Sequence, residues 1–62
     1  MRGFEIGDQV MAKFGTIPLV GTVVTIDEGS GRVLVRFSAV QQDWYESDEL
    51  RHFEIGGSPE DP

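Results

Sequence analysis

Hydrophobic and polar side chains alternate along several short segments of this chain. In residues 9–14, the even-numbered positions hold the apolar residues Val10, Ala12 and Phe14. The odd-numbered positions hold both polar and apolar residues. A period of two is typical of a β-strand that buries one face. Residues 32–37 repeat the alternation, and both segments are therefore predicted to be strands.

A further strand is predicted between these two, at residues 20–26. Nearly every residue there is β-branched, which suits the pleated surface of a sheet, and Gly21 indicates a bulge or the close approach of another backbone. Residues 27–31 are rich in turn-forming residues and predict a hairpin loop. Residues 15–19 contain Gly and Pro and are predicted to be the loop that connects the first two strands.

The C-terminal half predicts two shorter strands that are separated by one helical turn. Residues 38–42 are expected to be a connection, and residues 43–46 a short fourth strand. Residues 47–50 suit a single turn of helix, because Ser47 can cap it and acidic residues follow at its positive end. Residues 51–55 are predicted to be the closing strand.

Five short strands with a helical turn before the last one predict an all-β fold, namely a small five-stranded barrel over residues 1–55. An isolated hairpin is unstable in water. In a closed sheet, the side chains on both faces of each strand have a place to pack. Residues 56–62 are polar and are predicted to be a disordered tail. The predicted core consists of Ile6, Val10, Ala12, Phe14, Val23, Val33, Val35, Phe37 and Leu50.

Composition narrows the class of protein. The chain has 62 residues and no cysteine, so a disulfide framework, a zinc–thiolate site and a thiol nucleophile are excluded. Its apolar stretches are far shorter than the roughly 20 residues that cross a bilayer, and no segment has the pattern of a secretory signal. We therefore expect a cytoplasmic protein of one domain that does not enter a membrane.

Three stretches, taken in order, resemble the strands of SH3-like barrels, the Tudor type among them. Residues 7–14 resemble the opening strand, residues 21–24 the second strand, and residues 43–51 the fourth strand, the 3-10 turn and the closing strand. The resemblance covers residues 6–55 and implies the fold. It leaves the function open, because SH3-like barrels include methyl-lysine readers, peptide binders, RNA-binding modules, accessory subunits and one enzyme.

The adjacent aromatic residues Trp44 and Tyr45 are the main candidates for a binding site. Neighbouring strand residues point to opposite faces, so one ring is expected to pack inward and the other to lie at the surface. The resemblance to Tudor-like domains implies a cage for methylated lysine or arginine, in which acidic neighbours strengthen the cation–π attraction. A peptide groove and a general contact surface are the other interpretations. The predicted contact surface consists of Trp44, Tyr45, Asp43, Glu46 and the outward-facing Leu34.

No catalytic or metal site is predicted. Asp43, Glu46, Asp48 and Glu49 are close in sequence, but strand alternation points them in different directions. They are therefore expected to form a solvated surface rather than a metal site or an acid–base pair. His52 is the only histidine and lies in no triad or zinc-site motif. We predict a protein that uses no cofactor or metal and is not an enzyme.

The predicted function is a non-catalytic interaction or accessory module for a peptide or protein surface. Acidic residues outnumber basic ones by 11 to 5, and the resulting formal charge of −6 favours a basic partner. The same charge disfavours nucleic acid, since Lys13, Arg32 and Arg36 supply only a modest basic stripe. A weak RNA- or DNA-binding module is therefore an alternative and not the main prediction.

An oligomeric enzyme is a second alternative. Residues 7–13 resemble the opening of the plasmid-encoded dihydrofolate reductases, short SH3-like chains whose tetramer surrounds one pore. The resemblance fails at residues 41–45, where Gln-Gln-Asp-Trp-Tyr replaces the Val-Gln-Ile-Tyr signature of that family and Tyr45 alone matches. A homo-oligomer therefore stays open as a prediction.

Overall fold

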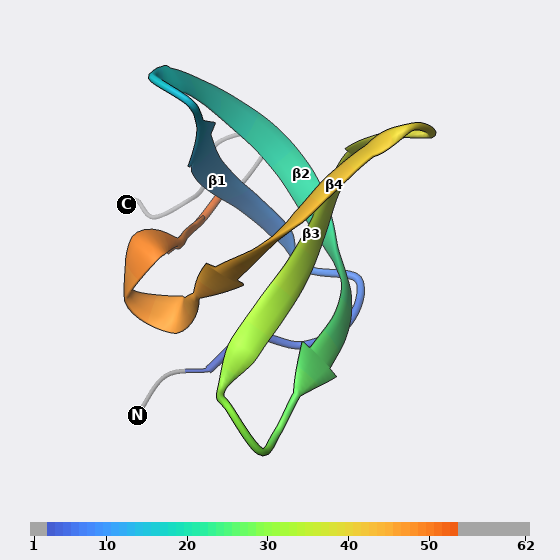
Figure 1. Ribbon diagram of the computed structural model, residues 1–62, viewed down its shortest axis with the longest axis vertical. Helices are drawn as coiled ribbons and strands as arrows, with labels where there is room; N and C mark the ends of the chain where they lie inside the picture. Colours follow the sequence, from blue (N-terminus) through green and yellow to red (C-terminus); the bar gives the residue numbers. More distant parts are fainter. Residues whose placement is uncertain (1–2, 54–62) are drawn as a thin grey trace, which may run out of the picture.

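The computed structural model describes residues 3–53, whose strands form one antiparallel sheet (Figure 1). Its elements are β1 (Gln9–Phe14), β2 (Ile17–Asp27), β3 (Arg32–Ser38), β4 (Gln41–Glu46), the 3-10 helix η1 (Ser47–Glu49) and β5 (Arg51–His52). Their order across the sheet is β4-β3-β2-β1-β5. No helix in this part of the chain is long and apolar enough to cross a membrane. The predicted all-β fold, with five strands and a helical turn before the last, is confirmed.

The sheet curls but does not close, so the predicted closure of the barrel is wrong. β4 and β5 lie at its two ends without hydrogen-bonding to each other, and η1 carries the chain across the gap between them (Figure 1). β5 pairs only with Val10 and Met11, so no described strand covers the rest of that edge of β1. We call the gap between β4 and the β1–β5 edge the seam.

Several strand boundaries differ from the prediction. β2 begins at Ile17, because Gly15 adopts a φ of 69° and lets the chain reverse in a tight turn instead of the longer predicted loop. Pro18 is tolerated in β2 because only β1 lies beside the strand at that point. β4 also begins earlier than predicted. β5 ends at His52, and residues 54–55 of the predicted closing strand lie outside the described residues. The predicted tail, residues 56–62, lies outside the described residues.

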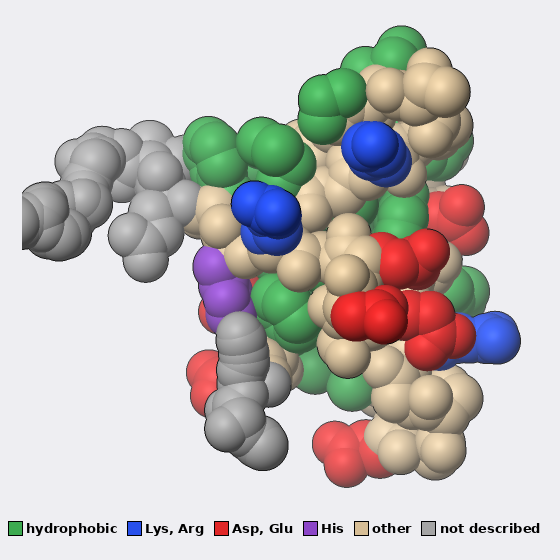
Figure 2. All heavy atoms as spheres, turned by 90° about the vertical axis from the view of Figure 1, so that its left-hand side faces the viewer, with side chains coloured by type: hydrophobic (Ala, Val, Ile, Leu, Met, Phe, Trp, Pro, Cys, Tyr) green, Lys and Arg blue, Asp and Glu red, His purple; other side chains and the backbone are tan. Residues whose placement is uncertain are grey.

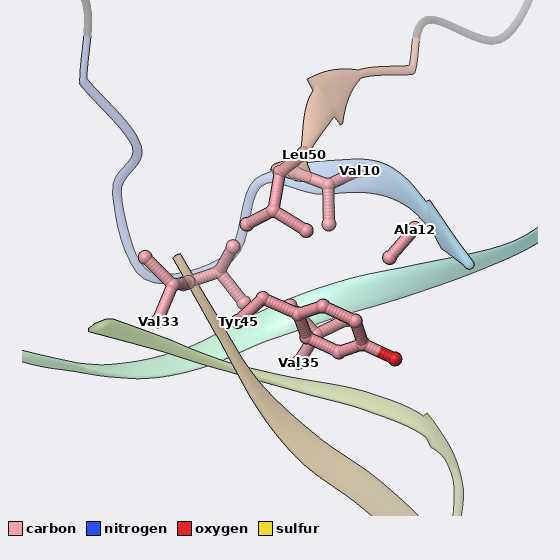
Figure 3. Close-up of a cluster of buried hydrophobic side chains, with 7 residues drawn as sticks. Val10, Ala12, Val33, Val35, Tyr45 and Leu50 are labelled. Carbon is pink, nitrogen blue, oxygen red and sulfur yellow. The ribbon is translucent and has the colours of Figure 1, made fainter. Parts of the chain in front are cut away.

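The core lies on the inner face of the curled sheet (Figure 3). Its buried side chains are Val10, Ala12, Val23, Val33, Val35, Tyr45 and Leu50. All of them except Tyr45 belong to the predicted core, which strand alternation therefore located correctly. Phe14 and Phe37 were also predicted to be buried, but both are only half-buried. Their rings pack edge to face with centroids 5.5 Å apart.

Ile6 contradicts the core prediction, since 69% of the residue is exposed. The inward parity of β1 does not extend back to Ile6, because the chain turns at Gly7, which has a φ of 98°. The Gly7 N–H donates a hydrogen bond to the Val23 carbonyl and fixes this turn against β2. Phe4, on the far side of the turn, packs against the core instead.

Gly21 marks a close backbone approach, as its position in the second strand indicated. A Cβ atom at this residue would lie 2.6 Å from Val35 Cγ1, 2.8 Å from the Arg36 carbonyl oxygen and 2.9 Å from Phe37 Cδ1. These distances are too short for any side chain, so the sheet can curl this tightly only because glycine occupies the position. The register irregularity in β2 falls later, between Val23 and Thr25.

Candidate functional site

The sheet separates the two adjacent aromatic residues of β4. Trp44 is 44% exposed, whereas Tyr45 is only 8% exposed. Tyr45 pairs with the buried Val33, and Trp44 pairs with the half-buried Leu34. The prediction that one ring packs inward and the other lies at the surface is therefore confirmed.

Trp44 and Leu34 form a small apolar patch on the outer face of β3 and β4, and polar residues lie around it. The strand register places Arg32 opposite Glu46, Leu34 opposite Trp44, and Arg36 opposite Gln42. The Arg32 Nε lies 3.2 Å from Glu46 Oε2, and the Arg36 Nε donates to Gln42 Oε1 over 3.3 Å. We call the surface formed by Arg32, Leu34, Arg36, Trp44 and Glu46 the Trp44 face.

The rings expected for a methyl-lysine cage are not gathered around Trp44. Phe37 packs edge to face against both Phe14 and Tyr45, with its centroid 6.0 Å from that of Tyr45. Within residues 3–53, no ring packs against the indole of Trp44. The Trp44 face therefore resembles a flat contact surface more than a cage.

Two exposed carboxylates cap the free edge of β4. Asp43 Oδ1 accepts a hydrogen bond from the Trp44 backbone N–H, and Glu49 Oε1 accepts one from the Glu46 N–H, both at 2.8 Å. Alternate N–H groups of an antiparallel strand point to the same side, so both of these groups point away from β3. Carboxylates that occupy such groups hinder the addition of another strand. Asp43 thus lies beside the Trp44 face rather than on it.

Tyr45 belongs to a different surface, the seam. Its hydroxyl donates to the Lys13 carbonyl oxygen over 3.0 Å and so joins β4 to β1 where the sheet stays open. A pocket of about 340 Å³ opens beside this bond. Its lining residues are Met11, Ala12, Lys13, Pro18, Tyr45, Glu49 and Arg51. The sequence analysis did not predict this pocket, because its lining residues come from separated segments of the chain.

The environment of Tyr45 disfavours ionisation of its phenol. Burial raises the pKa of Tyr45 above the usual value, and the negative charges of Asp43 and Glu49 raise it further. The folded chain therefore holds the Tyr45 proton more tightly than the unfolded chain does.

Stability should consequently fall in strongly alkaline solution. Below the usual tyrosine pKa of about 10, both states carry the proton and the fold keeps its full stability. As the pH rises through that value, the unfolded chain ionises first, and the free energy of unfolding decreases until the folded phenol ionises too. Denaturant unfolding at a series of pH values measures this decrease. Tyr45→Phe should show a shallower decrease, and an identical slope would contradict the assignment.

The remaining polar candidates are dispersed. His52 Nε2 lies 3.3 Å from Asp8 Oδ2, and its ring lies 4.5 Å from that of Phe4. In residues 3–53, no three His, Asp or Glu side chains are grouped as a metal site would need. Lys13 on β1 is separated by β2 from the two arginines of β3, so the three do not form one basic stripe.

Comparisons of the chain with protein-family models, curated proteins and solved structures gave no match. The geometry of the Trp44 face and of the seam is therefore the basis for the function. Both surfaces are built from residues that the fold brings together across strands.

Proposed function

We propose that this chain is a non-catalytic interaction or accessory module of SH3-like, Tudor-like type, which binds a peptide or protein surface through the Trp44 face. The strand order and the 3-10 helix before the last strand support the SH3-like part of the proposal. The resemblance of residues 7–14, 21–24 and 43–51 to the strands of such barrels points the same way.

The exposure of Trp44 is the observation that carries the proposal. A small domain has little apolar surface to spare, and burying an indole would add substantially to its stability. Trp44 instead lies open beside Leu34, with charged side chains around both. An apolar centre with a polar rim is the usual anatomy of a protein-binding surface, and tryptophan is enriched among residues that dominate binding energy.

A basic partner fits the charge of the molecule. The net charge of −6 attracts cations over long distances, and the acidic groups next to the Trp44 face act at short range. Asp43, Asp48 and Glu49 are all exposed along β4 and η1. The guanidinium of Arg32 is already paired with Glu46, so it adds little attraction for an anion.

Single-stranded nucleic acid is a second candidate, favoured by one observation. Arg32 and Arg36 lie two residues to either side of Leu34 on β3, and so flank the exposed indole. Stacking on an aromatic ring between cations is a common way to hold a base. The net negative charge opposes such binding, and an oligonucleotide that bound at low salt would favour this candidate over the protein partner.

Titration with lysine- and arginine-rich peptides tests the main proposal, because Trp44 is the only tryptophan. Its emission should shift to shorter wavelength in a saturable way as water leaves the ring, and the affinity should fall with added salt. Peptides of the same length and neutral composition serve as controls. No response to any basic peptide would contradict the proposal.

Trp44→Ala should weaken the binding of a responding peptide by about thirtyfold, the effect typical of a dominant interface residue. Calorimetric titration measures the loss without the tryptophan signal. Ile6→Ala is the matched control, since Ile6 is also an exposed apolar residue but lies outside the Trp44 face. Equal affinity for both variants would show that the partner binds elsewhere.

A further inference from the structure

The seam pocket separates two lips of opposite charge. Lys13 and Arg51 line it from β1 and β5, and Glu49 lines it from η1 on the opposite side. Asp43 does not itself line the pocket, but it lies on β4 two residues before the lining residue Tyr45. Figure 2 views the molecule from the side of β5 and η1 and shows basic side chains above a group of acidic ones. We call Lys13 and Arg51 the basic lip, and Asp43 and Glu49 the acidic lip.

Both lips have charge available for a partner. Within residues 3–53, neither cation of the basic lip is in an ion pair, since the ion pairs found there involve other residues. Asp43 and Glu49 accept hydrogen bonds from backbone N–H groups and from no cationic side chain in the described part of the chain. Exposed charges of both signs therefore face each other across the pocket.

The lining of the pocket is largely apolar, and the β4 edge beside it is protected against the addition of a strand. Its apolar lining residues are Met11, Ala12, Pro18 and Tyr45. The backbone N–H groups of Trp44 and Glu46 on the neighbouring edge of β4 are already occupied by carboxylates. Strand addition at the β4 side of the pocket is therefore hindered, and a partner docks on that side through side chains.

We propose that a second copy of this chain docks on the seam and forms a two-fold symmetric dimer. A rotation of 180° about an axis that runs along the seam turns the second copy face down and exchanges its two sides. The acidic lip of each copy then lies against the basic lip of the other, and the two apolar floors cover each other. A partner whose charges all have the same sign would instead face like charges on one of the two lips. This repulsion would weaken its binding.

The net charge of −6 on each copy does not prevent this contact. Exposed charges separated by more than about 8 Å are largely screened at physiological salt, whereas the opposed lips are in direct contact. The contact is small, however, and the expected dimer is weak and dependent on concentration. Asp43 and Glu49 border both surfaces, but Trp44 and Leu34 do not line the seam pocket, so Trp44→Ala distinguishes the two proposals.

Sedimentation of the full chain over a range of concentrations, extended to high concentration, tests the dimer. Arg51→Glu and Glu49→Arg should each raise the dimer dissociation constant about tenfold or more, because one lip then meets a like charge. An equimolar mixture of the two variants should restore the dimer. In the mixed dimer the two unchanged lips meet in one contact, and in the other contact the two reversed residues oppose each other with opposite signs.

Three further experiments complete the test. Glu28→Arg changes the charge by the same amount on the β2–β3 turn, away from the seam, and should leave the dimer intact. If Glu49→Arg disturbs η1, the pair Lys13→Glu and Asp43→Lys provides a second exchange of charge across the lips. Trp44→Ala should not change the mass of the assembly.

Three results would overturn the dimer. The first is a monomer at every concentration, including a monomer whose seam is occupied by a peptide. The second is a dimer that tolerates both single charge reversals. The third is a mixture of folded, oppositely reversed variants that stays monomeric, which would show that the lips do not face each other.

Discussion

Gly21→Val should leave the chain largely unfolded at room temperature. Even the first added carbon would lie within 3 Å of Val35, Phe37 and the Arg36 carbonyl oxygen. Val35 is fully buried, and the carbonyl belongs to the backbone of β3, so neither can move away cheaply. Overpacking a core costs about 1–3 kcal/mol and occasionally more. A domain of this size has only about 3–5 kcal/mol to lose.

Circular dichroism and thermal melting measure this loss of stability, and two further variants are compared with Gly21→Val. Gly21→Ala adds the first carbon alone and should cost about 1–3 kcal/mol. Gly29→Ala is the matched control, because a Cβ atom added there would lie 3.6 Å from its nearest neighbour, Asp27 Oδ1, which is ordinary contact. That control should change stability by less than about 0.5 kcal/mol. A Gly21→Val protein that melts like the parent would contradict the tight curl of the sheet.

Tyr45→Ala should destabilise the fold by about 3–5 kcal/mol, the usual cost of truncating a buried aromatic residue to alanine. Tyr45 is buried, packs edge to face on Phe37, and bonds to the Lys13 carbonyl across the seam. Its removal therefore takes away both part of the core and the side chain that joins β4 to β1. Denaturant unfolding measures the loss.

Two other variants divide this loss into its parts. Tyr45→Phe keeps the ring and removes only the hydroxyl, at a cost of about 0.5–1.5 kcal/mol. Phe37→Ala should destabilise the fold less than Tyr45→Ala does, because Phe37 is only half-buried. Full burial of Phe37, which the sequence predicted, would have implied a loss of about 3–5 kcal/mol. If Phe37→Ala proved the more harmful of the two, Phe37 rather than Tyr45 would be the central ring of the fold.

Local patterns in the sequence predict most of the fold. The alternation in residues 9–14 gives β1 with its correct bounds, and the predicted turn at residues 27–31 is observed except that Asp27 still belongs to β2. Parity carries no information about where a strand bends or ends. It therefore places Ile6 in the core, although the turn at Gly7 directs that side chain outward.

The candidate site could be predicted only in part. The exposure of Trp44 follows from alternation once Tyr45 is known to face inward, and Leu34 follows from the parity of its own strand. The pairing of Leu34 with Trp44 depends on the register of β3 against β4, which no local pattern specifies. The opposed lips of the seam depend on more distant contacts, since Lys13 and Glu49 meet only in the folded chain.

Patterns along the chain were enough to predict the all-β class, the succession of strands and the identity of most core residues. Each of these depends on neighbours a few positions apart, and such neighbours impose the period of two and the turns. Tertiary structure alone decided that the sheet stays open, that Tyr45 bridges the opening, and that charges of opposite sign line it. These features arise from contacts between strands far apart in the chain, and packing selects such contacts.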